Sequence, residues 1–211
     1  MIRFYGVVLY TLTILMIIKS IDYPLAEFVK YDFLPEIRDF FKLITDFVKS
    51  TCWILCSIMI YFIFVFRNGF CIRTFATFIK EECVRIFVSR TALLLYLSVL
   101  FSGIFVNILK PIFGRVRPYL FFETGEKGFQ FLQFSSSFAS FPSGHSATAL
   151  SIATVFAISF PKWKYYFFST GLIFAFSRVA TSNHYLSDII VGGTIGFLTA
   201  IYFNRRLNAI L

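Results

Sequence analysis

The chain contains only two histidines, and each stands in a polar cluster at the edge of an apolar stretch. His145 ends the run Pro-Ser-Gly-His, and His184 precedes Asp188 by four residues in the segment "SNHYLSD". If that segment is helical, the Asp188 carboxylate shares a face with the imidazole, where it can fix the tautomer and stabilise the charged form of the ring. An imidazole held in this way can act as a nucleophile or a general base.

Cationic side chains accompany both histidines. Lys110 and Arg117 lie in the segment "KPIFGRVRP", which follows one apolar stretch, and Arg178 ends another. Ionisable residues at a membrane edge are costly and usually mark function. A single arginine of this kind often only reaches the lipid headgroups, but several cations beside two histidines indicate an anion-binding site. Arg115 lies within the same segment, and the sequence leaves its role open.

The residues before His145 are suited to the start of a helix that binds an anion. Pro142 fits a helix start, Ser143 can cap the helix, and Gly144 lets a ligand approach the backbone. The free amide hydrogens of the first helical turn then point toward the anion. A helix cap without a ligand would explain the proline and the serine, but not the glycine and the histidine.

The composition places these residues in a membrane protein. Of 211 residues, 58% are hydrophobic and only 15% are charged, with a mean hydropathy of +0.77, whereas soluble domains carry roughly 25% charged residues. We expect an all-α, polytopic membrane protein with six transmembrane helices in a single domain, residues 1–211. The first stretch follows Arg3 as in a signal peptide, but it lacks a small-residue cleavage pattern, so we expect it to be retained. The apolar stretches are residues 4–18, 51–66, 91–109, 146–160, 165–180 and 189–203.

The basic residues predict the orientation of these helices. With six spans both termini lie on one side of the membrane, and that side receives ten basic residues and only two acidic ones, Glu81 and Glu82. The opposite side carries ten basic and nine acidic residues. Because basic residues are enriched in cytoplasmic loops, we expect cytoplasmic termini, a plasma (inner) membrane and a site on the external or periplasmic side. No basic run or exposed aromatic stripe points to nucleic acid.

The segments that connect the apolar stretches carry no obvious chemistry. Residues 34–50 place apolar and charged positions at helical spacing, which predicts an amphipathic helix in the outer interface, and residues 75–88 resemble a second one on the cytoplasmic side. Residues 119–141 are expected to form a lid, with aromatic side chains toward lipid and Glu123, Glu126 and Lys127 toward water. The cysteines at positions 52, 56, 71 and 83 are interpreted as small buried hydrophobic residues rather than as disulfides or metal ligands.

Taken together, the polar segments resemble the three signature motifs of the type 2 phosphatidic acid phosphatase family, part of the phosphatase and vanadium haloperoxidase superfamily. The pattern is Lys, six residues, Arg-Pro; then Pro-Ser-Gly-His; then Ser-Arg, five residues, His, three residues, Asp. Every position is matched in this chain. The resemblance covers residues 90–203, six spans suit the family, and the implied protein is a membrane-bound lipid phosphatase.

The resemblance also implies a role for each site residue. His184 would attack phosphorus and form a phosphohistidine, Asp188 would orient it, and His145 would protonate the leaving oxygen. No metal or other cofactor is implied, because cations and helix amides can stabilise the spread negative charge of phosphoryl transfer. The phosphoryl oxygens would be held by Lys110, Arg117, Ser143, Gly144 and Arg178.

Two other functions fit the same motifs. A haloperoxidase would bind vanadate at the same histidine, but membrane burial favours the phosphatase. A non-catalytic lipid-phosphate binder or transporter would not need His184, Asp188 and His145 together, so the presence of all three also favours the phosphatase. The expected partners are the bilayer and a lipid phosphate or pyrophosphate, and the sequence indicates no oligomeric state. The candidate substrates lean toward bacterial envelope lipids: lipid A, undecaprenyl pyrophosphate, phosphatidylglycerophosphate and phosphatidic acid.

Overall fold

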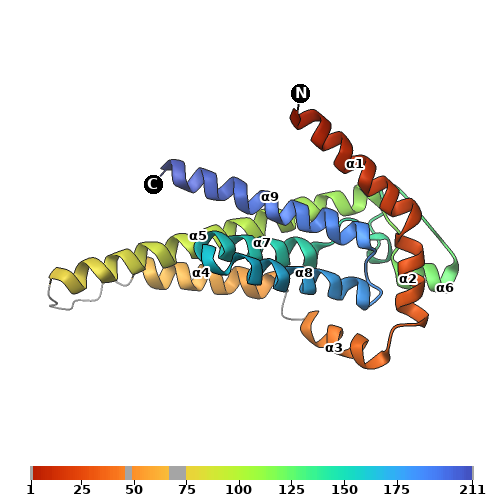
Figure 1. Ribbon diagram of the computed structural model, residues 1–211, viewed down its shortest axis with the longest axis horizontal. Helices are drawn as coiled ribbons and strands as arrows, with labels where there is room; N and C mark the ends of the chain where they lie inside the picture. The colour runs from red at the N-terminus through yellow and green to blue at the C-terminus, as the bar shows by residue number, and fades with distance from the viewer. Residues whose placement is uncertain (1, 46–48, 67–74, 211) are drawn as a thin grey trace.

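The computed structural model describes residues 2–45, 49–66 and 75–210, and these residues form a helical bundle. Within these ranges there is no β-strand, only an isolated antiparallel bridge between Arg115 and Phe129. Figure 1 shows long helices that run side by side, with the short helices α2, α3 and α6 gathered at one end. The prediction of an all-α protein is confirmed.

The N-terminal part begins with a bent pair of helices. α1 (Ile2–Ser20) and α2 (Asp22–Tyr31) meet at an angle of 45°, and the sequence predicted only the first of them. α3 (Pro35–Thr45) is the predicted amphipathic helix, and residues 46–48 of that prediction lie outside the described part. α4 (Ser50–Phe66) matches the second apolar stretch.

α5 (Phe75–Phe113) is a single helix of 39 residues. The prediction of a separate surface helix over residues 75–88 is therefore wrong. The sequence "KEECVRIFVSRTALLL" contains neither glycine nor proline, so nothing stops the helical hydrogen bonds at the start of the apolar stretch. α5 ends in the first motif, with Lys110 and Pro111 in its last turn.

The motif-bearing half of the chain forms the core. α7 (Gly144–Ser159) packs against α5 and against the two helices that follow, α8 (Lys164–Ala180) and α9 (Leu186–Ile210). Successive helices in this half run in opposite directions (Figure 1). Every second connection between them therefore lies at the same end of the bundle. One buried apolar cluster joins α7, α8 and α9 to α2 and consists of Val29, Ala149, Leu150, Ala175, Val179 and Ile189.

The number of membrane spans is confirmed only in part. Three candidate spans are long and apolar enough to cross a membrane: Ile86–Phe113 in α5, Leu186–Ala209 in α9, and a third whose described parts are α3 and α4. The bent pair α1 and α2 can count as a fourth. α7 has 16 residues and α8 has 17, so each is about 25 Å long, less than the hydrocarbon thickness of about 30 Å. The six predicted stretches are thus helical, while their lengths support three or four complete spans.

The interpretation of the cysteines as buried residues is wrong where it can be checked. Cys52 and Cys56 are both exposed on α4. Because α4 is an apolar helix with few neighbours other than α5, these thiols occupy positions that lipid would cover in a membrane. Cys71 and the side chain of Cys83 lie outside the described part of the chain.

Candidate active site

All three motifs meet at the end of the bundle where α2 and α6 (Pro118–Thr124) lie. The C-terminal ends of α5 and α8 reach this end together with the N-terminal ends of α7 and α9 (Figure 1). The fold therefore brings the eight predicted site residues to one end of the bundle: Lys110, Arg117, Ser143, Gly144, His145, Arg178, His184 and Asp188.

The loop after α5 is held in place by the segment that follows α6. The Gln130 N–H donates to the Gly114 carbonyl at 2.9 Å, and the Val116 N–H donates to the Gly128 carbonyl at 3.1 Å. Gly114 has a φ of +55°, and a Cβ atom there would lie only 1.7 Å from the carbonyl oxygen of Gln130. Only glycine fits this position, so the glycine of the first motif fixes the path of the arginines that follow it.

The side chains of residues 119–141 follow the lid prediction in part. The charged residues Glu123, Glu126 and Lys127 are exposed, as expected. The aromatic residues divide, since Phe121 is buried beneath the loop whereas Phe131 and Phe134 are exposed. This segment is therefore folded and anchored to the first motif.

Ser143 caps α7, as the sequence predicted. Its Oγ accepts a hydrogen bond from the Ser146 N–H at 3.4 Å, and the helix begins at Gly144. Pro142 lies before the cap and outside the first helical turn. The Ser143 N–H donates to the backbone carbonyl of Asp188 at 3.0 Å, which ties the second motif to the third.

The start of α7 lies close to both α9 and the lysine of the first motif. A Cβ atom at Gly192 of α9 would lie 2.2 Å from the carbonyl oxygen of Ser143, so the two backbones are in direct contact. On the other side, a Cβ atom at Gly144 would lie 3.8 Å from the Nζ of Lys110. The ammonium group and the free amide hydrogens of this helical turn therefore face a shared space, which suits an anion.

His184 lies in the short connection between α8 and α9, and its side chain is buried. Its backbone N–H donates to the Arg178 carbonyl at 3.1 Å, so the connection folds back onto the end of α8. Its Nδ1 lies 2.7 Å from the carbonyl oxygen of Ser140. Because a carbonyl can only accept, Nδ1 carries the proton and Nε2 keeps its lone pair.

The electrostatic surroundings keep the His184 ring neutral. Burial lowers the pKa of His184 to about 4, although the nearby carboxylate of Asp188 opposes this shift. The charges of Arg117 and Arg178 lower the pKa of His184 further. At neutral pH the imidazole is therefore uncharged and its Nε2 is available as a nucleophile.

Asp188 reaches His184 through Ser140 rather than by the direct hydrogen bond that the spacing suggested. The Oδ2 of Asp188 lies 3.6 Å from Nδ1 of His184, and it accepts hydrogen bonds from the Ser140 hydroxyl at 2.6 Å and the Tyr185 N–H at 2.8 Å. The spacing argument assumed one helix through both residues, whereas α9 begins only at Leu186. Ser140 was missed by the sequence analysis, because its carbonyl, which any residue type has, makes the key contact.

The predicted site residues differ in how much of their surface is exposed. Ser143, His184 and Asp188 are buried. The partly exposed members of the predicted set are Lys110, Arg117, Gly144, His145 and Arg178. Arg117 also has a buried Nε that makes no hydrogen bond to any described residue, which leaves a donor for a ligand oxygen. No three His, Cys, Asp or Glu side chains in the described ranges are arranged to hold a metal ion.

Arg115, whose role the sequence left open, does not join these partly exposed cations. Its fully buried guanidinium lies between two carboxylates, 2.7 Å from Asp22 and 2.5 Å from Asp188. Although burial opposes its charge, these carboxylates raise the pKa of Arg115. Asp22 precedes all three motifs in the chain and gave no sequence signal of a role in the site.

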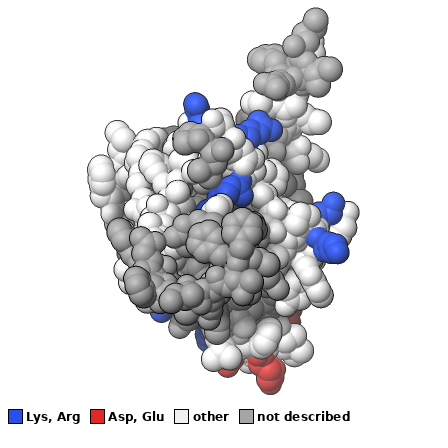
Figure 2. All heavy atoms as spheres, turned by 90° about the vertical axis from the view of Figure 1, so that its left-hand side faces the viewer, with Lys and Arg blue, Asp and Glu red and all other residues white. Residues whose placement is uncertain are grey.

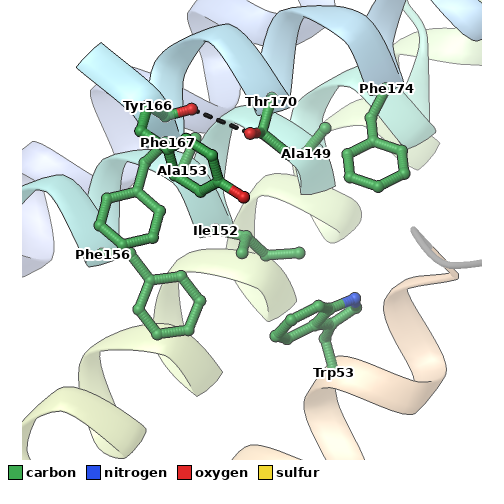
Figure 3. A pocket seen from close by; sticks show the side chains of 10 residues that line it. Trp53, Ala149, Ile152, Ala153, Phe156, Tyr166, Phe167, Thr170 and Phe174 are labelled. Carbon is green, nitrogen blue, oxygen red and sulfur yellow. Dashed lines mark hydrogen bonds between the residues drawn. The ribbon is translucent and has the colours of Figure 1, made fainter. Parts of the chain in front are cut away.

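An apolar pocket of about 200 Å³ opens between α4, α7 and α8 (Figure 3). Trp53 of α4 lies opposite Ile152 of α7, and the hydroxyl of Thr170 is bonded to the Tyr166 carbonyl at 2.9 Å. The pocket contains none of the predicted site residues. The lining of the pocket includes Ala149, which follows His145 by one turn of α7. The pocket therefore begins about one helical turn from the site.

Comparison with known proteins agrees with this site. The model of the PAP2 superfamily matches residues 91–210, which include all three motifs. The lipid A 1-phosphatase of Rhizobium johnstonii is 36% identical to the chain over 170 residues, which cover 78% of this chain and 67% of that protein. The bundle and its site are those of a membrane phosphatase. The chain belongs to the PAP2 superfamily, and within it the chain is a lipid phosphate phosphatase.

Two solved structures share the fold. LpxE from Aquifex aeolicus superposes with a TM-score of 0.61 at 23% identity, and the match covers 87% of this chain and 94% of that one. The PAP2-type phosphatidylglycerolphosphate phosphatase from Bacillus subtilis superposes with a TM-score of 0.63 at 19% identity, and the match covers 98% and 96% of the two chains. The arrangement of the helices is thus shared with LpxE and with a solved transmembrane PAP2-type phosphatase.

Proposed function

We propose that this protein removes a phosphate group from a membrane lipid through a phosphohistidine on His184. The observation that carries the proposal is the 2.7 Å contact between Nδ1 of His184 and the Ser140 carbonyl, which leaves Nε2 as the ring nitrogen with a free lone pair. A neutral imidazole with this tautomer can attack phosphorus without first losing a proton. The proposal gives each of the predicted site residues a role in the reaction.

In the first step, Nε2 of His184 forms a bond to phosphorus while the bond between phosphorus and the lipid oxygen breaks. His145 donates a proton to that oxygen, so the lipid leaves as an alcohol. Lys110 and Arg117, together with Arg178 and the amides at the start of α7, neutralise the charge that spreads over the other phosphoryl oxygens. Asp188 stabilises the positive charge that the ring of His184 gains.

In the second step, water attacks the phosphohistidine and the bond between phosphorus and Nε2 breaks. His145, deprotonated by the first step, takes the proton from the water. Inorganic phosphate then leaves, and His184 returns to its neutral state. Each cycle therefore consumes one water and restores both histidines.

For the substrate we propose a phosphorylated saccharide lipid of the lipid A kind. The basis is the 36% identity to a protein named lipid A 1-phosphatase. The apolar pocket of Figure 3 supports a lipid in general, because an acyl chain that lay against α7 would have its headgroup about one helical turn away, at His145. Burial of such a chain contributes about 0.8 kcal/mol per CH₂ group.

For the location we propose the external face of a bacterial inner membrane. Figure 2 shows the end of the bundle opposite the site, where, among the residues that the structure describes, basic side chains are scattered over the surface and acidic ones show at the lower edge. Arg90 belongs to this end, because it bonds to Asn204 and Asn208 near the end of α9. A basic end favours the cytoplasm, and this supports a site on the external side.

The proposal is tested by phosphate release from a lipid panel, with the purified protein in detergent micelles and EDTA present. The panel contains lipid A, phosphatidylglycerophosphate, undecaprenyl pyrophosphate and phosphatidic acid. We expect the fastest release from lipid A, and a loss of about 1,000-fold or more for His184→Ala. Lys162→Ala is the control. Lys162 lies between α7 and α8, at the end of the bundle opposite the site, so this variant should retain full activity. A quench at alkaline pH should trap acid-labile phosphate on the wild type and on Lys162→Ala, but not on His184→Ala.

Three outcomes would contradict the proposal. Full activity of His184→Ala would exclude the phosphohistidine. Binding of lipid phosphates without any release would indicate a non-catalytic binder. Halide oxidation with vanadate and hydrogen peroxide, in the absence of phosphate release, would indicate a haloperoxidase.

A further inference from the structure

A buried row of three charges connects the N-terminal helix pair to the active site. The Nη2 of Arg115 lies 2.7 Å from Oδ2 of Asp22 in α2, and its Nη1 lies 2.5 Å from Oδ1 of Asp188 in α9. All three side chains are at most 1% exposed. Ser187 joins the row, because its hydroxyl accepts from Arg115 at 2.7 Å and donates to Asp22 at 2.5 Å.

The guanidinium of Arg115 is held at both Nη groups by side chains and is flanked by two aromatic rings, while its buried Nε makes no hydrogen bond to any described residue. Its plane lies over the ring of Tyr185, with the central carbon 4.2 Å from the ring centroid, and near the ring of Phe129 at 5.1 Å. Its backbone carbonyl accepts the Ser140 N–H at 3.1 Å. Both Nη groups are bonded to protein side chains, so this arginine has no exposed surface with which to meet a lipid phosphate.

Asp22 also contacts the backbone at the start of α9. Its Oδ1 accepts the backbone N–H of Ser187 at 3.0 Å, in the first turn of α9. A carboxylate at this place satisfies one of the free N–H groups of the helix and stabilises the helix terminus. Asp22 thus contacts both the helix that carries Asp188 and the arginine that is paired with Asp188.

We propose that Arg115 is a positioning residue for Asp188 and His184, and that Asp22 supplies the charge that keeps Arg115 in place. The inference rests on the proposed roles of His184 and Asp188. Arg115 holds Oδ1 of Asp188, so that Oδ2 stays with Ser140 and faces the imidazole. The N-terminal helices carry no family motif, but through Asp22 they help to orient the nucleophile.

The balance of charges distinguishes this role from simple packing. Without Arg115, Asp22 and Asp188 would be two buried carboxylates on either side of Ser187 with no cation between them, and like charges at this range repel strongly. Without Asp22, Arg115 keeps its partner Asp188 but loses the second contact that sets its angle. Removal of the Asp22 charge should therefore harm the wild type and help a variant that lacks Arg115.

The test is steady-state kinetics on the full chain in micelles, with the lipid substrate that the wild type hydrolyses fastest. We expect Arg115→Gln to lower kcat by about 100-fold and Arg115→Lys and Asp22→Asn by about 10-fold, with KM within about threefold of the wild type. The double variant Asp22→Asn/Arg115→Gln should regain about tenfold in kcat over Arg115→Gln. Inorganic phosphate should inhibit all of them with unchanged affinity, because Arg115 does not touch the phosphate.

Matched controls use the same substitutions at other places. Asp39→Asn removes an exposed carboxylate from α3, and Arg90→Gln removes an arginine from the opposite end of the bundle. Both should leave kcat and KM unchanged. If Arg115→Gln does not fold, Arg115→Lys and Asp22→Asn still carry the test, since both variants leave a cation beside Asp188.

Specific results would overturn the inference. Near-normal kcat in Arg115→Gln, or in both Arg115→Lys and Asp22→Asn, would show that Asp188 needs no such support. A rise in KM with a parallel loss of phosphate affinity would make Arg115 a phosphate ligand. A double variant no better than Arg115→Gln would show that packing, and not charge, matters. Failure of the proposed function itself looks different, since then the wild type would release no phosphate or His184→Ala would remain active.

Discussion

The backbone carbonyl of Ser140 accepts a hydrogen bond from Nδ1 of His184 at 2.7 Å. The hydroxyl of the same serine donates to Oδ2 of Asp188 at 2.6 Å. The residue thus fixes the tautomer of one site residue with its main chain and the position of the other with its side chain. This arrangement separates two contributions that a direct contact between His184 and Asp188 would combine.

Substitution of Ser140 by alanine should therefore harm the site only in part. The carbonyl contact to His184 remains, while Asp188 loses one hydrogen bond to a charged group, which is worth about 1.5–3 kcal/mol. We expect kcat to fall by roughly 10- to 100-fold, with KM little changed. Ser135→Ala, at an exposed serine in the same loop, is the control for the assay. A fully active Ser140→Ala enzyme would show that Asp188 is held well enough without the hydroxyl.

The ring of His184 should titrate far below the range of an ordinary histidine. Burial lowers its pKa to about 4, whereas an unperturbed histidine titrates near 6.5. Because the chain has only two histidines, a His145→Gln variant labelled with ¹³C and ¹⁵N histidine gives a single ring signal by NMR. In phosphate-free micelles this signal should stay constant from pH 7 to pH 5.5 and move only below pH 5.

The same titration reveals the influence of the neighbouring arginine. Removal of the positive charge in Arg117→Gln favours the protonated ring, so the midpoint should rise relative to the parent variant. Lys162→Gln, at the far end of the bundle, should leave the midpoint where it was. A parent midpoint near pH 6.5 would mean that the ring is solvated, and the nucleophile would then need another explanation for its neutral state.

The motif residues could be predicted because apolar stretches determine where helices end. Lys110 and Arg178 follow apolar stretches, and His145 precedes one, so alternating helices had to bring them to the same end of the bundle. The cap at Ser143 followed from residue type alone. These predictions needed no knowledge of how the helices pack.

The supporting contacts could not be predicted, for two physical reasons. Asp22 and Arg115 are 93 positions apart, and their contact depends on the bend between α1 and α2, which no residue pattern announces. Ser140 acts through a carbonyl group, and the backbone carries no mark in a sequence. The error at residues 75–88 has a related origin, since an amphipathic pattern does not reveal whether a helix stops or continues.

The close contact between α9 and the start of α7 should make Gly192 intolerant of a side chain. A Cβ atom there would lie 2.2 Å from the carbonyl oxygen of Ser143, a backbone atom that cannot move without shifting the second motif. We expect Gly192→Ala to lose about 1–3 kcal/mol of stability through overpacking, and most of its activity as well. Thermal unfolding in micelles and phosphate release measure the two effects.

Gly103 provides the matched control for that substitution. It lies in α5, and a Cβ atom there would meet nothing within 4 Å. Gly103→Ala should therefore be neutral or stabilise the helix by up to about 1 kcal/mol. If Gly192→Ala were equally well tolerated, the backbones of α7 and α9 would have to be farther apart than the structure places them.

The orientation of the bundle in the membrane predicts which positions an impermeant reagent can reach. Ser136 is exposed in the short helix η2 (Ser136–Phe138) at the site end, and Ala209 is exposed in the last turn of α9 at the basic end. Single cysteines at these positions are introduced into a chain whose own cysteines are replaced by serine, since Cys52 and Cys56 are exposed on α4. The reagent is a charged maleimide, applied to intact spheroplasts and then to permeabilised ones.

We expect Ser136→Cys to react in intact spheroplasts and Ala209→Cys to react only after permeabilisation. The physical reason is the excess of basic residues near Ala209, which include Arg205 and Arg206 and which favour the cytoplasmic side. The site end is then in contact with the outer leaflet, where a lipid presents its phosphate at the depth of the cations. The opposite labelling pattern would reverse the orientation, and the same chemistry would then act on phosphates of the cytoplasmic leaflet. Equal labelling of both positions in intact spheroplasts would mean that α9 does not cross the membrane.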